Sequence, residues 1–353
     1  MKIKVVIAEK DEAYTSKLIH NLSGNYSGQL ELYTFSELEL LEQFLKAESP
    51  DVVLVAEEFR KARENVGRKT MFAFLIPYKA EEVDGVPAIC KYQKVENIYK
   101  QILSLYSELG KNYVSRSENA EGTKVISFFG ISGGAGASTL AAGYAMHQSR
   151  SGSKVLYLNL EKLASTRAFF MQEGTAAFDE VLFALKSRKM SLELKIESTV
   201  IADASGVNFF APCANCMDIL ELTEEDIENL IEGICRMGQY DYLVIDGDFS
   251  MDAKMNMICD YSNHIVLVST GDEISNLKMQ KYITSLHSME ERSKVNIQGK
   301  ICVIYNKFRN AVCKIVENTE VRNIGGIPRL ESAAAIENAK YVADLTFWEA
   351  MEQ

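Results

Sequence analysis

The sequence predicts an α/β protein built from two doubly wound parallel-sheet domains. Short apolar runs of strand length alternate with helical patterns, which is the order expected when each strand is followed by a crossover helix. Two such series flank a polar stretch rich in Ser, Asn, Gly and charged residues. That composition is typical of a linker, which we expect over residues 113–123.

The first domain is expected over residues 1–112. Its strand-like runs are residues 4–8, 30–35, 52–56, 72–76 and 87–91, and its helical patterns are residues 11–22, 36–46 and 95–108. Ser36 followed by Glu39 has the spacing of a capping box, so the second helix is expected to begin there. These alternations predict a doubly wound parallel sheet.

The second domain is expected over residues 124–353. Strands are predicted at residues 124–130, 155–160, 209–211, 242–245, 264–269 and 301–305. Helices are predicted at residues 137–149, 178–188, 224–237, 274–289 and 333–343. The pattern again predicts a mainly parallel sheet with helices on both faces.

Composition limits the classes of partner. With 353 residues the chain suits two or three domains, and its net charge is −11 without a dense Lys/Arg run. An acidic surface argues against non-specific nucleic-acid binding. No run reaches the roughly 18 apolar residues of a spanning helix, and the acidic end after Tyr341 lacks a basic amphipathic face. We therefore expect a cytoplasmic protein without direct membrane insertion, with Phe347 and Trp348 packed or at an interface.

Seven scattered cysteines indicate reduced thiols rather than a disulfide framework. Cys213 and Cys216 form a CxxC spacing. No second pair and no paired histidines complete a zinc site, so coincidence is favoured over a metal or redox role. The sequence leaves the role of these two cysteines open.

A glycine-rich turn, Ile131-Ser-Gly-Gly-Ala-Gly-Ala-Ser-Thr139, joins a predicted buried strand to a helix. Gly133, Gly134 and Gly136 permit a tight wrap with positive φ angles, which turns backbone N–H groups inward as an anion nest. The helix N-terminus adds its dipole, and Ser138 and Thr139 stand where hydroxyls would contact Mg²⁺ and phosphate. An ordinary glycine-rich turn is the alternative. The coincidence of strand, turn and hydroxyl-led helix favours phosphate binding.

This turn resembles the deviant Walker A motif of the MinD/ParA family, whose usual form is G-K-G-G-x-G-K-T-T. The family's signature lysine falls on Ser132, its Walker lysine on Ala137 and its first glycine on Ile131. The resemblance implies ATP and Mg²⁺ as cofactors, with backbone amides carrying the binding. Loss of both lysines implies slow or absent hydrolysis. The implied nucleotide contacts are Ser132, Gly133, Gly134, Ala135, Gly136, Ala137, Ser138 and Thr139.

The resemblance extends along the chain. Asn159 and Glu161 fall on the family's D-x-D pair at its hydrolytic positions, and asparagine cannot act as a base. Asp246 ends an apolar strand, as in Walker B, so Ser138, Glu161 and Asp246 are the implied magnesium contacts. Asp248 has no role that the family implies.

Two later motifs imply a nucleotide rather than a lone phosphate. Asn306 and Lys307 end a strand similar to the family strand whose terminal asparagine contacts adenine. Pro328 and Arg329 belong to a turn similar to the one that borders the base. Each motif alone is weak evidence for a nucleotide site. The two occur in the same order along the chain as in the family, which strengthens the inference.

The first domain looks like a response-regulator receiver. Glu9 and Asp11 stand at the acidic pair, and Lys91 matches the receiver lysine, but Ala56 occupies the phosphoacceptor position. Alanine cannot be phosphorylated, and neighbouring Glu57 would point to the other face of its strand. We favour a helix N-cap role for the acidic pair over a magnesium role, and a docking role for the domain. No glycine-rich loop follows Ala8, which argues against another flavodoxin-like ligand binder.

Together the two halves resemble the TadZ/CpaE family. The resemblance implies an ATP-binding factor that helps place a Tad-type pilus or secretion assembly, with a homodimer and Tad proteins as partners and recruitment to a cell pole. Two alternatives remain open. One is an active ATPase in which another cation replaces the lysines. The other is a nucleotide-free interaction scaffold. The candidate cations are Lys162, Lys254, Lys307 and Arg309.

Overall fold

The computed structural model describes residues 2–67, 69–107, 109, 122–171, 177–187, 191–293, 297–316, 321–330 and 334–351. Most of the expected linker lies outside these residues. The contacts between residues divide the chain into two compact units. Unit 1 is Met1–Ser115 with Phe183–Thr199, and unit 2 is Arg116–Leu182 with Val200–Gln353. Residues 183–199, expected in the second domain, thus group with unit 1.

Unit 1 contains a sheet in the order β2-β1-β3-β4-β6-β5, parallel except for the short β5–β6 hairpin. Its strands are β1 (Ile3–Ala8), β2 (Leu30–Phe35), β3 (Val52–Val55), β4 (Met71–Ile76), β5 (Glu82–Val83) and β6 (Val86–Cys90). Its helices are α1 (Glu12–Tyr26), α2 (Leu38–Ala47), the 3-10 helix η1 (Glu57–Asn65), α3 (Val95–Ser107) and α6 (Leu192–Thr199). This is the doubly wound parallel sheet that the sequence predicts.

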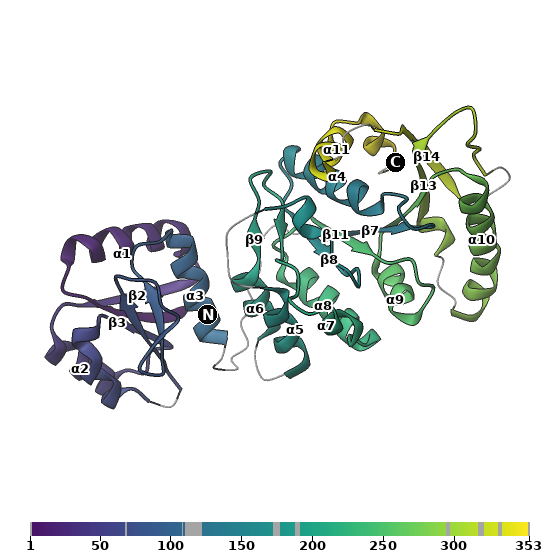
Figure 1. Ribbon diagram of the computed structural model, residues 1–353. Coiled ribbons are helices and arrows are strands. Elements are labelled where there is room, and N and C mark those ends of the chain that lie inside the picture. The colour runs from purple at the N-terminus through teal and green to yellow at the C-terminus, as the bar shows by residue number, and fades with distance from the viewer. Residues whose placement is uncertain are drawn as a thin grey trace. The chain divides into compact units, whose positions relative to one another are not determined.

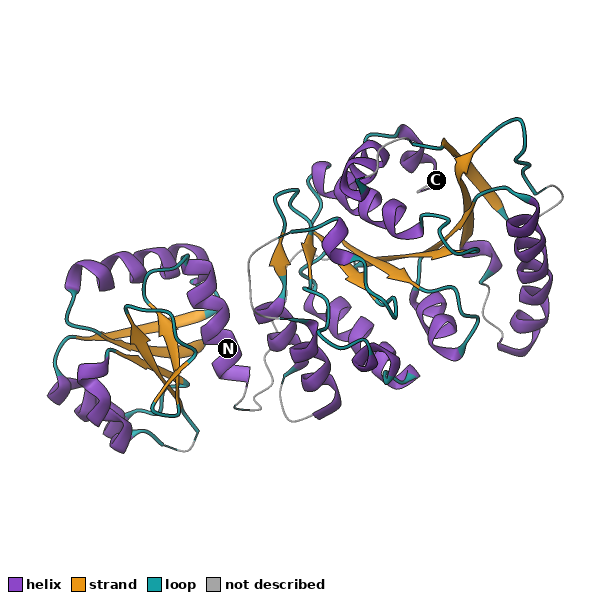
Figure 2. Ribbon diagram, in the orientation of Figure 1, coloured by secondary structure: helices purple, strands orange, loops and turns teal. Residues whose placement is uncertain are grey.

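Both faces of this sheet are covered, as the alternation within β1 shows. Ile3, Val5 and Ile7 pack in a cluster with α1 and α3, whereas Val6 and Ala8 pack in a second cluster with α2 and η1. Because successive side chains point to opposite faces, a strand buried on both faces must be apolar throughout. Figure 2 shows the strands as a central layer between helices.

The expected capping box at the second helix is wrong. Helix α2 begins at Leu38, and its N-cap is Glu37 in extended conformation without a side-chain cap hydrogen bond. A capping box does occur at α8, where the Thr223 hydroxyl accepts from the Asp226 N–H and Asp226 accepts from the Thr223 N–H. Spacing alone did not identify the box, because the backbone must enter the helix at the serine for its hydroxyl to reach the N3 amide.

Unit 2 contains a sheet in the order β14-β13-β12-β7-β11-β8-β10-β9, parallel except for the edge strand β9, which pairs antiparallel with β10. Its strands are β7 (Lys124–Gly130), β8 (Val155–Asn159), β9 (Ile201–Ala202), β10 (Asn208–Phe209), β11 (Tyr242–Gly247), β12 (His264–Ser269), β13 (Ile301–Phe308) and β14 (Arg322–Pro328). The sequence did not predict β14 as a strand. It is exposed at the sheet edge, and its two glycines hide the strand pattern.

The helices of unit 2 lie on both faces of this sheet. They are α4 (Ala137–Arg150), η2 (Thr166–Ala168), α5 (Phe178–Ser187), α7 (Met217–Leu220), α8 (Glu224–Met237), α9 (Ala253–Tyr261), α10 (Glu273–Ser293), η3 (Gln298–Lys300), α11 (Ala335–Ala343) and η4 (Thr346–Met351). The residues of α5 from Phe183 onward group with unit 1. In Figure 1, α4 and α11 lie together on one face, and α8 and α9 lie on the other. Within the described residues no helix is long and apolar enough to cross a membrane.

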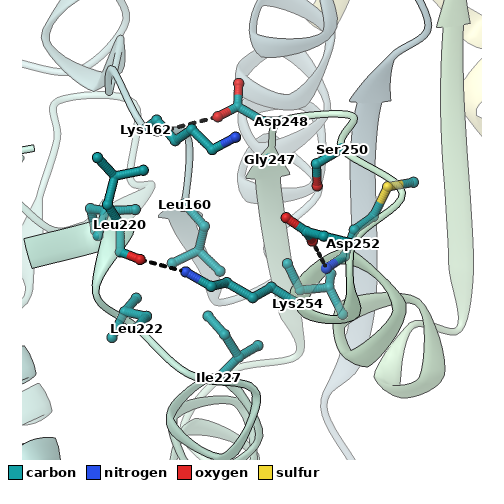
Figure 3. A pocket seen from close by; sticks show the side chains of 13 residues that line it. Leu160, Lys162, Leu220, Leu222, Ile227, Gly247, Asp248, Ser250, Asp252 and Lys254 are labelled. Carbon is teal, nitrogen blue, oxygen red and sulfur yellow. Dashed lines mark hydrogen bonds between the residues drawn. The ribbon is translucent and has the colours of Figure 1, made fainter. Parts of the chain in front are cut away.

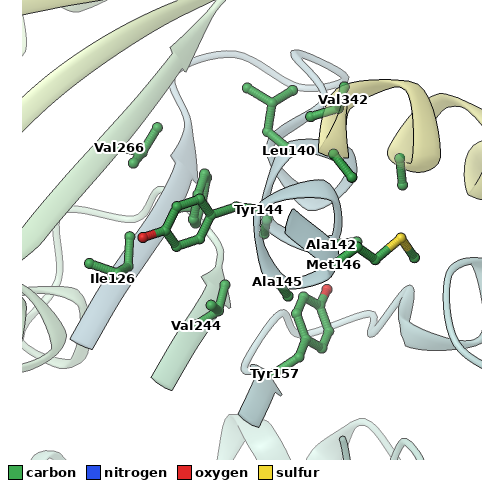
Figure 4. Packing of buried hydrophobic residues seen from close by; sticks show 14 of the residues in the cluster. Ile126, Leu140, Ala142, Tyr144, Ala145, Met146, Tyr157, Val244, Val266 and Val342 are labelled. Atoms are coloured by element: carbon green, nitrogen blue, oxygen red, sulfur yellow. The ribbon is translucent and has the colours of Figure 1, made fainter. Parts of the chain in front are cut away.

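Close packing of α11 onto α4 fixes the helix that follows the glycine-rich turn. A Cβ on Gly143 would lie 2.5 Å from Val342 Cγ1, so glycine is what lets the helices approach. Figure 4 shows Val342 of α11 next to α4. Trp348 is 1% exposed, lies beside Tyr144 with ring centroids 5.1 Å apart, and donates from Nε1 to the Val342 carbonyl at 2.9 Å. The expected packing of Trp348 is confirmed. The middle of α4 is thereby held against the core of unit 2.

Candidate functional site

The glycine-rich turn runs from the end of β7 to the first turn of α4. Gly134 has φ of 73° and Gly136 has φ of 96°, so two of the three glycines adopt the left-handed conformation, while Gly133 does not. The Ala135 N–H donates to the Ser132 carbonyl at 3.1 Å. Among the described residues, the N–H groups of Gly134 and Gly136 have no acceptor in the protein. The turn therefore presents free amides beside a helix N-terminus, as an anion nest requires.

The end of β13 lies against this turn. Asn306 is 6% exposed, donates from Nδ2 to the Ala135 carbonyl at 2.8 Å, and accepts the Lys307 N–H at its Oδ1. Lys307 donates from Nζ to the Gly134 carbonyl at 2.7 Å. A Cβ on Gly136 would lie 2.3 Å from Asn306 Nδ2. The residue expected to contact adenine is thus bonded to the turn, with one amide N–H still free among its described neighbours.

Ser132, at the signature-lysine position, is bonded to the start of α10. Its hydroxyl lies 2.8 Å from the hydroxyl of fully buried Ser275, which also lies 2.8 Å from the hydroxyl of Thr270. Asp272 accepts from the Ser275 N–H at 2.9 Å and from the Thr270 hydroxyl. Sequence reasoning missed this network, because Thr270 and Ser275 lie far from the turn in the chain and carry no motif.

Acidic and hydroxyl groups meet at the ends of β8 and β11. The Ser138 hydroxyl donates to Glu161 Oε1 at 3.0 Å. Asn159 Nδ2 lies 3.1 Å from Glu161 Oε2 and 3.2 Å from Asp246 Oδ2, so the amide bridges the two carboxylates. The Tyr157 hydroxyl donates to Asp246 Oδ2 at 2.6 Å. Because β11 pairs with β8 in parallel register, Asp246 opposite Asn159, the sheet itself brings these groups together.

Asp246 is fully buried, and one of its carboxylate oxygens, Oδ1, has no hydrogen-bond partner in the described structure. Burial and the nearby Glu161 carboxylate raise the pKa of Asp246 well above its usual value. An enclosed, unpartnered carboxylate oxygen beside a second carboxylate and the Ser138 hydroxyl offers the hard oxygen donors that Mg²⁺ prefers. These three residues therefore fit a magnesium ion, which would neutralise the buried charge.

The remaining predicted residues surround the same end of the sheet. Ala137 begins α4 and Thr139 lies in its first turn, both partly buried. Pro328 is paired in register with Phe308, so β14 ends next to the strand that carries Asn306. Arg329 follows and is exposed. The candidate residues for phosphate, magnesium and base thus occupy the carboxyl ends of parallel strands of one sheet.

Asp248 and two of the candidate cations belong to a neighbouring pocket (Figure 3). Asp248 Oδ2 accepts the Lys162 N–H at 2.9 Å, and Lys254 donates from Nζ to the Leu220 carbonyl at 2.7 Å. Asp252 caps α9 by accepting from the Met255 N–H. The amino group of Lys254 is therefore held by a backbone carbonyl at this pocket.

Cys213 and Cys216 are both free thiols. Cys213 lies beside Asp179 and Asp218, with one ligand atom from each of the three residues within 4.8 Å of the others. Burial, followed by the hydrogen bond to Asp179, raises the pKa of the Cys213 thiol. A protonated thiol is a poor nucleophile, which argues against a redox role for this cysteine.

In unit 1 the receiver-like positions are brought together without a phosphoacceptor. Ala56 follows β3, is 5% exposed, and donates its N–H to the Ala8 carbonyl next to Glu9. Glu9 forms an ion pair with Lys91. Asp11 is the N-cap of α1 and accepts from the Tyr14 N–H at 3.0 Å, as the sequence favoured. Lys91 thus neutralises a carboxylate of its own domain.

Replacing Lys91 with methionine is expected to lower the free energy of unfolding of the chain by about 3 kcal/mol, because Glu9 is left buried without its counter-charge. The two side chains are only 14% and 6% exposed. Chemical denaturation monitored by circular dichroism measures this loss. Lys10→Met is the control, since Lys10 pairs with Glu58 at an exposed site and should change little. Equal effects of the two variants would contradict the buried-pair interpretation.

Comparison with known proteins places each unit. Residues 1–107 match the family model described as TadZ-like, receiver domain. A chain of the MinC:MinD cell division protein complex from Aquifex aeolicus is 19% identical with a TM-score of 0.52, over 65% of this chain and 97% of that chain. A ParA family ATPase from Chlorobium tepidum TLS is 18% identical with a TM-score of 0.50, over 64% of this chain and 93% of that chain.

A further similar structure is the septum site-determining protein MinD complexed with Mg-ADP from Pyrococcus horikoshii OT3. It is 16% identical, with a TM-score of 0.49, over 65% of this chain and 93% of that chain. No curated protein matches the sequence. At these identities the likeness to the MinD and ParA structures establishes the fold. The receiver-like domain and the MinD/ParA-type fold expected from the sequence are both confirmed.

Proposed function

We propose that this chain, which joins a TadZ-like receiver domain to a MinD/ParA-type fold, is an ATP-binding localisation factor that hydrolyses ATP weakly or not at all. Its task would be to help place a Tad-type pilus or secretion assembly. The observation that carries the proposal is the turn at Gly134 and Gly136. Two left-handed glycines leave free amides at the N-terminus of α4, the helix whose Ser138 donates to Glu161 next to Asp246.

ATP and Mg²⁺ fit this arrangement by charge and by donor type. Free backbone N–H groups and a helix N-terminus bind phosphate oxygens, and the dipole favours negative charge. The acidic cluster of Ser138, Glu161 and Asp246 supplies oxygen donors for the cation. Backbone binding of this kind needs no lysine in the turn, so the substitutions at positions 132 and 137 do not prevent it.

Weak hydrolysis is supported by what the altered positions do. The Asn159 amide group donates hydrogen bonds to both Glu161 and Asp246. An amide cannot accept a proton from water, so Asn159 cannot act as a base. Ala137 offers no charge to the phosphates, and Ser132 is bonded to Ser275. The loss of such electrostatic groups typically costs orders of magnitude in rate.

Partners and location are part of the proposal. The TadZ-like receiver domain supports contact with Tad proteins, and Ala56 removes phosphorylation as its input. Exposed apolar side chains at Ile274, Leu277 and Val312 support a protein partner, for which we propose a second copy of this chain. The complex would act in the cytoplasm and be recruited to a cell pole or to a membrane-associated assembly.

Purified protein is expected to bind Mg-ATP in isothermal titration calorimetry and to release the nucleotide unhydrolysed on denaturation, as mass spectrometry would show. Phosphate release measured over hours should remain near the background of buffer with Mg-ATP. Turnover on the order of 1 per second, as in typical enzymes, would instead establish an active ATPase with a substitute cation. Absence of any binding would leave the nucleotide-free scaffold.

A further inference from the structure

Tyr157 lies in the middle of β8, on the sheet face that α4 covers. Its side chain is fully buried in the same apolar cluster as Val244 of β11. Because successive side chains of a strand point to opposite faces, Asn159 and Asp246, each two residues further along, lie on this face as well. Figure 4 shows Tyr157 next to α4, the helix whose first turn carries Ser138.

The Tyr157 hydroxyl donates to a buried carboxylate and not to a neutral group. It lies 2.6 Å from Asp246 Oδ2, and both residues are fully buried. Asn159 Nδ2 lies 3.2 Å from the same oxygen, so two donors converge on Oδ2. Tyr144 of the same cluster shows the ordinary alternative, since its hydroxyl accepts from Gln148 Nε2 at 2.9 Å. The hydroxyl of Tyr157 is thus bonded to the acidic end of β11.

The two oxygens of the Asp246 carboxylate have unequal surroundings. Oδ2 has both donors, whereas Oδ1 is enclosed and has no hydrogen-bond partner among the described residues. Leaving a buried acceptor unpaired costs free energy, so donors that served only to satisfy this charge would be expected on both oxygens. Two donors on Oδ2 restrict the rotation of the carboxylate and leave Oδ1 as the oxygen that a cation can use.

Aromatic packing fixes the position of the hydroxyl. The ring centroids of Tyr157 and Phe170 are 4.9 Å apart, and those of Phe170 and Phe209 are 5.5 Å apart. All three side chains are buried in one cluster. Because a protein interior is close-packed, a ring enclosed in this way has little freedom to swing. The hydroxyl is therefore held in one place relative to Asp246.

We propose that Tyr157 is a positioning residue for the magnesium site, which orients Asp246 through Oδ2 and keeps Oδ1 for the cation that accompanies the nucleotide. Bound Mg²⁺ would supply positive charge between the carboxylates and the phosphates. Tyr157 acts on it through Asp246, because its buried hydroxyl is bonded to that carboxylate. The inference rests on the proposed nucleotide binding and goes beyond it by assigning the orientation of the carboxylate to a residue outside every motif.

The test measures how much Mg²⁺ strengthens the binding of ATP. Isothermal titration calorimetry gives the Kd for ATP in EDTA and in Mg²⁺, and the ratio of the first to the second is compared between variants. Tyr157→Phe removes the hydroxyl and keeps the ring, so it is expected to fold, which circular dichroism checks. Its ratio should be about 10- to 100-fold smaller than that of wild type, while its Kd in EDTA stays within about threefold.

Tyr144→Phe is the matched control. It removes a hydroxyl from another fully buried tyrosine of the same cluster, whose partner is Gln148 and not a carboxylate. Its ratio should equal that of wild type. The same fall of the ratio in Tyr144→Phe as in Tyr157→Phe would overturn the inference, because core packing would then be the cause.

Two further outcomes separate this inference from the proposed function. If Tyr157→Phe weakens binding equally in Mg²⁺ and in EDTA, or not at all, its ratio is unchanged and Tyr157 has no positioning role, while nucleotide binding stands. A wild-type ratio near one would also overturn the inference, since no cation would then act at the site. If wild type binds ATP under neither condition, the proposed function and this inference both fall.

Discussion

Replacing Gly136 with alanine is expected to lower the free energy of unfolding by about 3 kcal/mol and to abolish binding of Mg-ATP. Gly136 has φ of 96°, which an alanine adopts only with strain. The new Cβ would also lie 2.3 Å from Asn306 Nδ2. Asn306 would have to move and lose its bond to the Ala135 carbonyl. Chemical denaturation and calorimetric titration measure the two effects.

Gly133→Ala is the matched control for stability. Gly133 lies in the same turn, has no positive φ, and a Cβ there would meet nothing within 4 Å. This variant should stay within about 1 kcal/mol of wild type. A similar loss of stability in both variants would mean that the turn tolerates no side chain anywhere, and would remove the special role given to the contact between Gly136 and Asn306.

Replacing Asp246 with asparagine is expected to remove the stabilisation by Mg-ATP. At a nucleotide concentration of 100 times its Kd, wild type should gain about 2.7 kcal/mol. An asparagine cannot supply the negative charge that the site needs for the cation. The variant should therefore show little or no rise in melting temperature when Mg-ATP is added, whereas wild type shows a clear rise.

Without nucleotide the same variant should respond differently to pH. Burial and Glu161 raise the pKa of Asp246 in the folded state above its unfolded value of roughly 3.9. The folded state therefore binds this proton more tightly, and wild-type stability falls as pH rises from about 4 through the folded pKa. Asp246→Asn lacks this loss, so its stability should depend less on pH in that window.

Asp344→Asn is the control for the change in charge. Asp344 is 72% exposed and pairs with Arg150 at the surface, where an ion pair contributes little. It should keep both the stabilisation by Mg-ATP and the wild-type dependence on pH. If Asp246→Asn retains full stabilisation by Mg-ATP, the magnesium site at the end of β11 would be wrong.

Sequence patterns located most of the fold because strands buried on both faces must be continuously apolar. The runs at β1, β7 and β11 satisfy that demand, and their ends were identified to within about two residues. Edge strand β14 and the start of α2 escaped prediction. An edge strand has no such demand on its composition, and a cap depends on backbone geometry that spacing does not determine.

The glycine-rich turn was located by the sequence alone. A strand, a turn with three glycines and a hydroxyl-led helix are local features, so residues 131–139 were sufficient to indicate an anion nest. The alterations at Ser132, Ala137, Asn159 and Ala56 were also visible, since each is defined by its place in a motif. What those residues contact was not visible.

Those contacts join residues that are far apart in the chain. Ser132 meets Ser275 over 143 positions, and Lys307 meets Gly134 over 173. Lys91, which follows β6, pairs with Glu9, which follows β1, although β3 and β4 lie between these two strands in the sheet. Strand order decides which strand ends are neighbours, and that order is set by how crossover helices pack, which no local pattern records. The sequence by itself therefore determined a phosphate-binding turn without its lysines, and only the tertiary structure decided that a lysine from β13 is bonded to it.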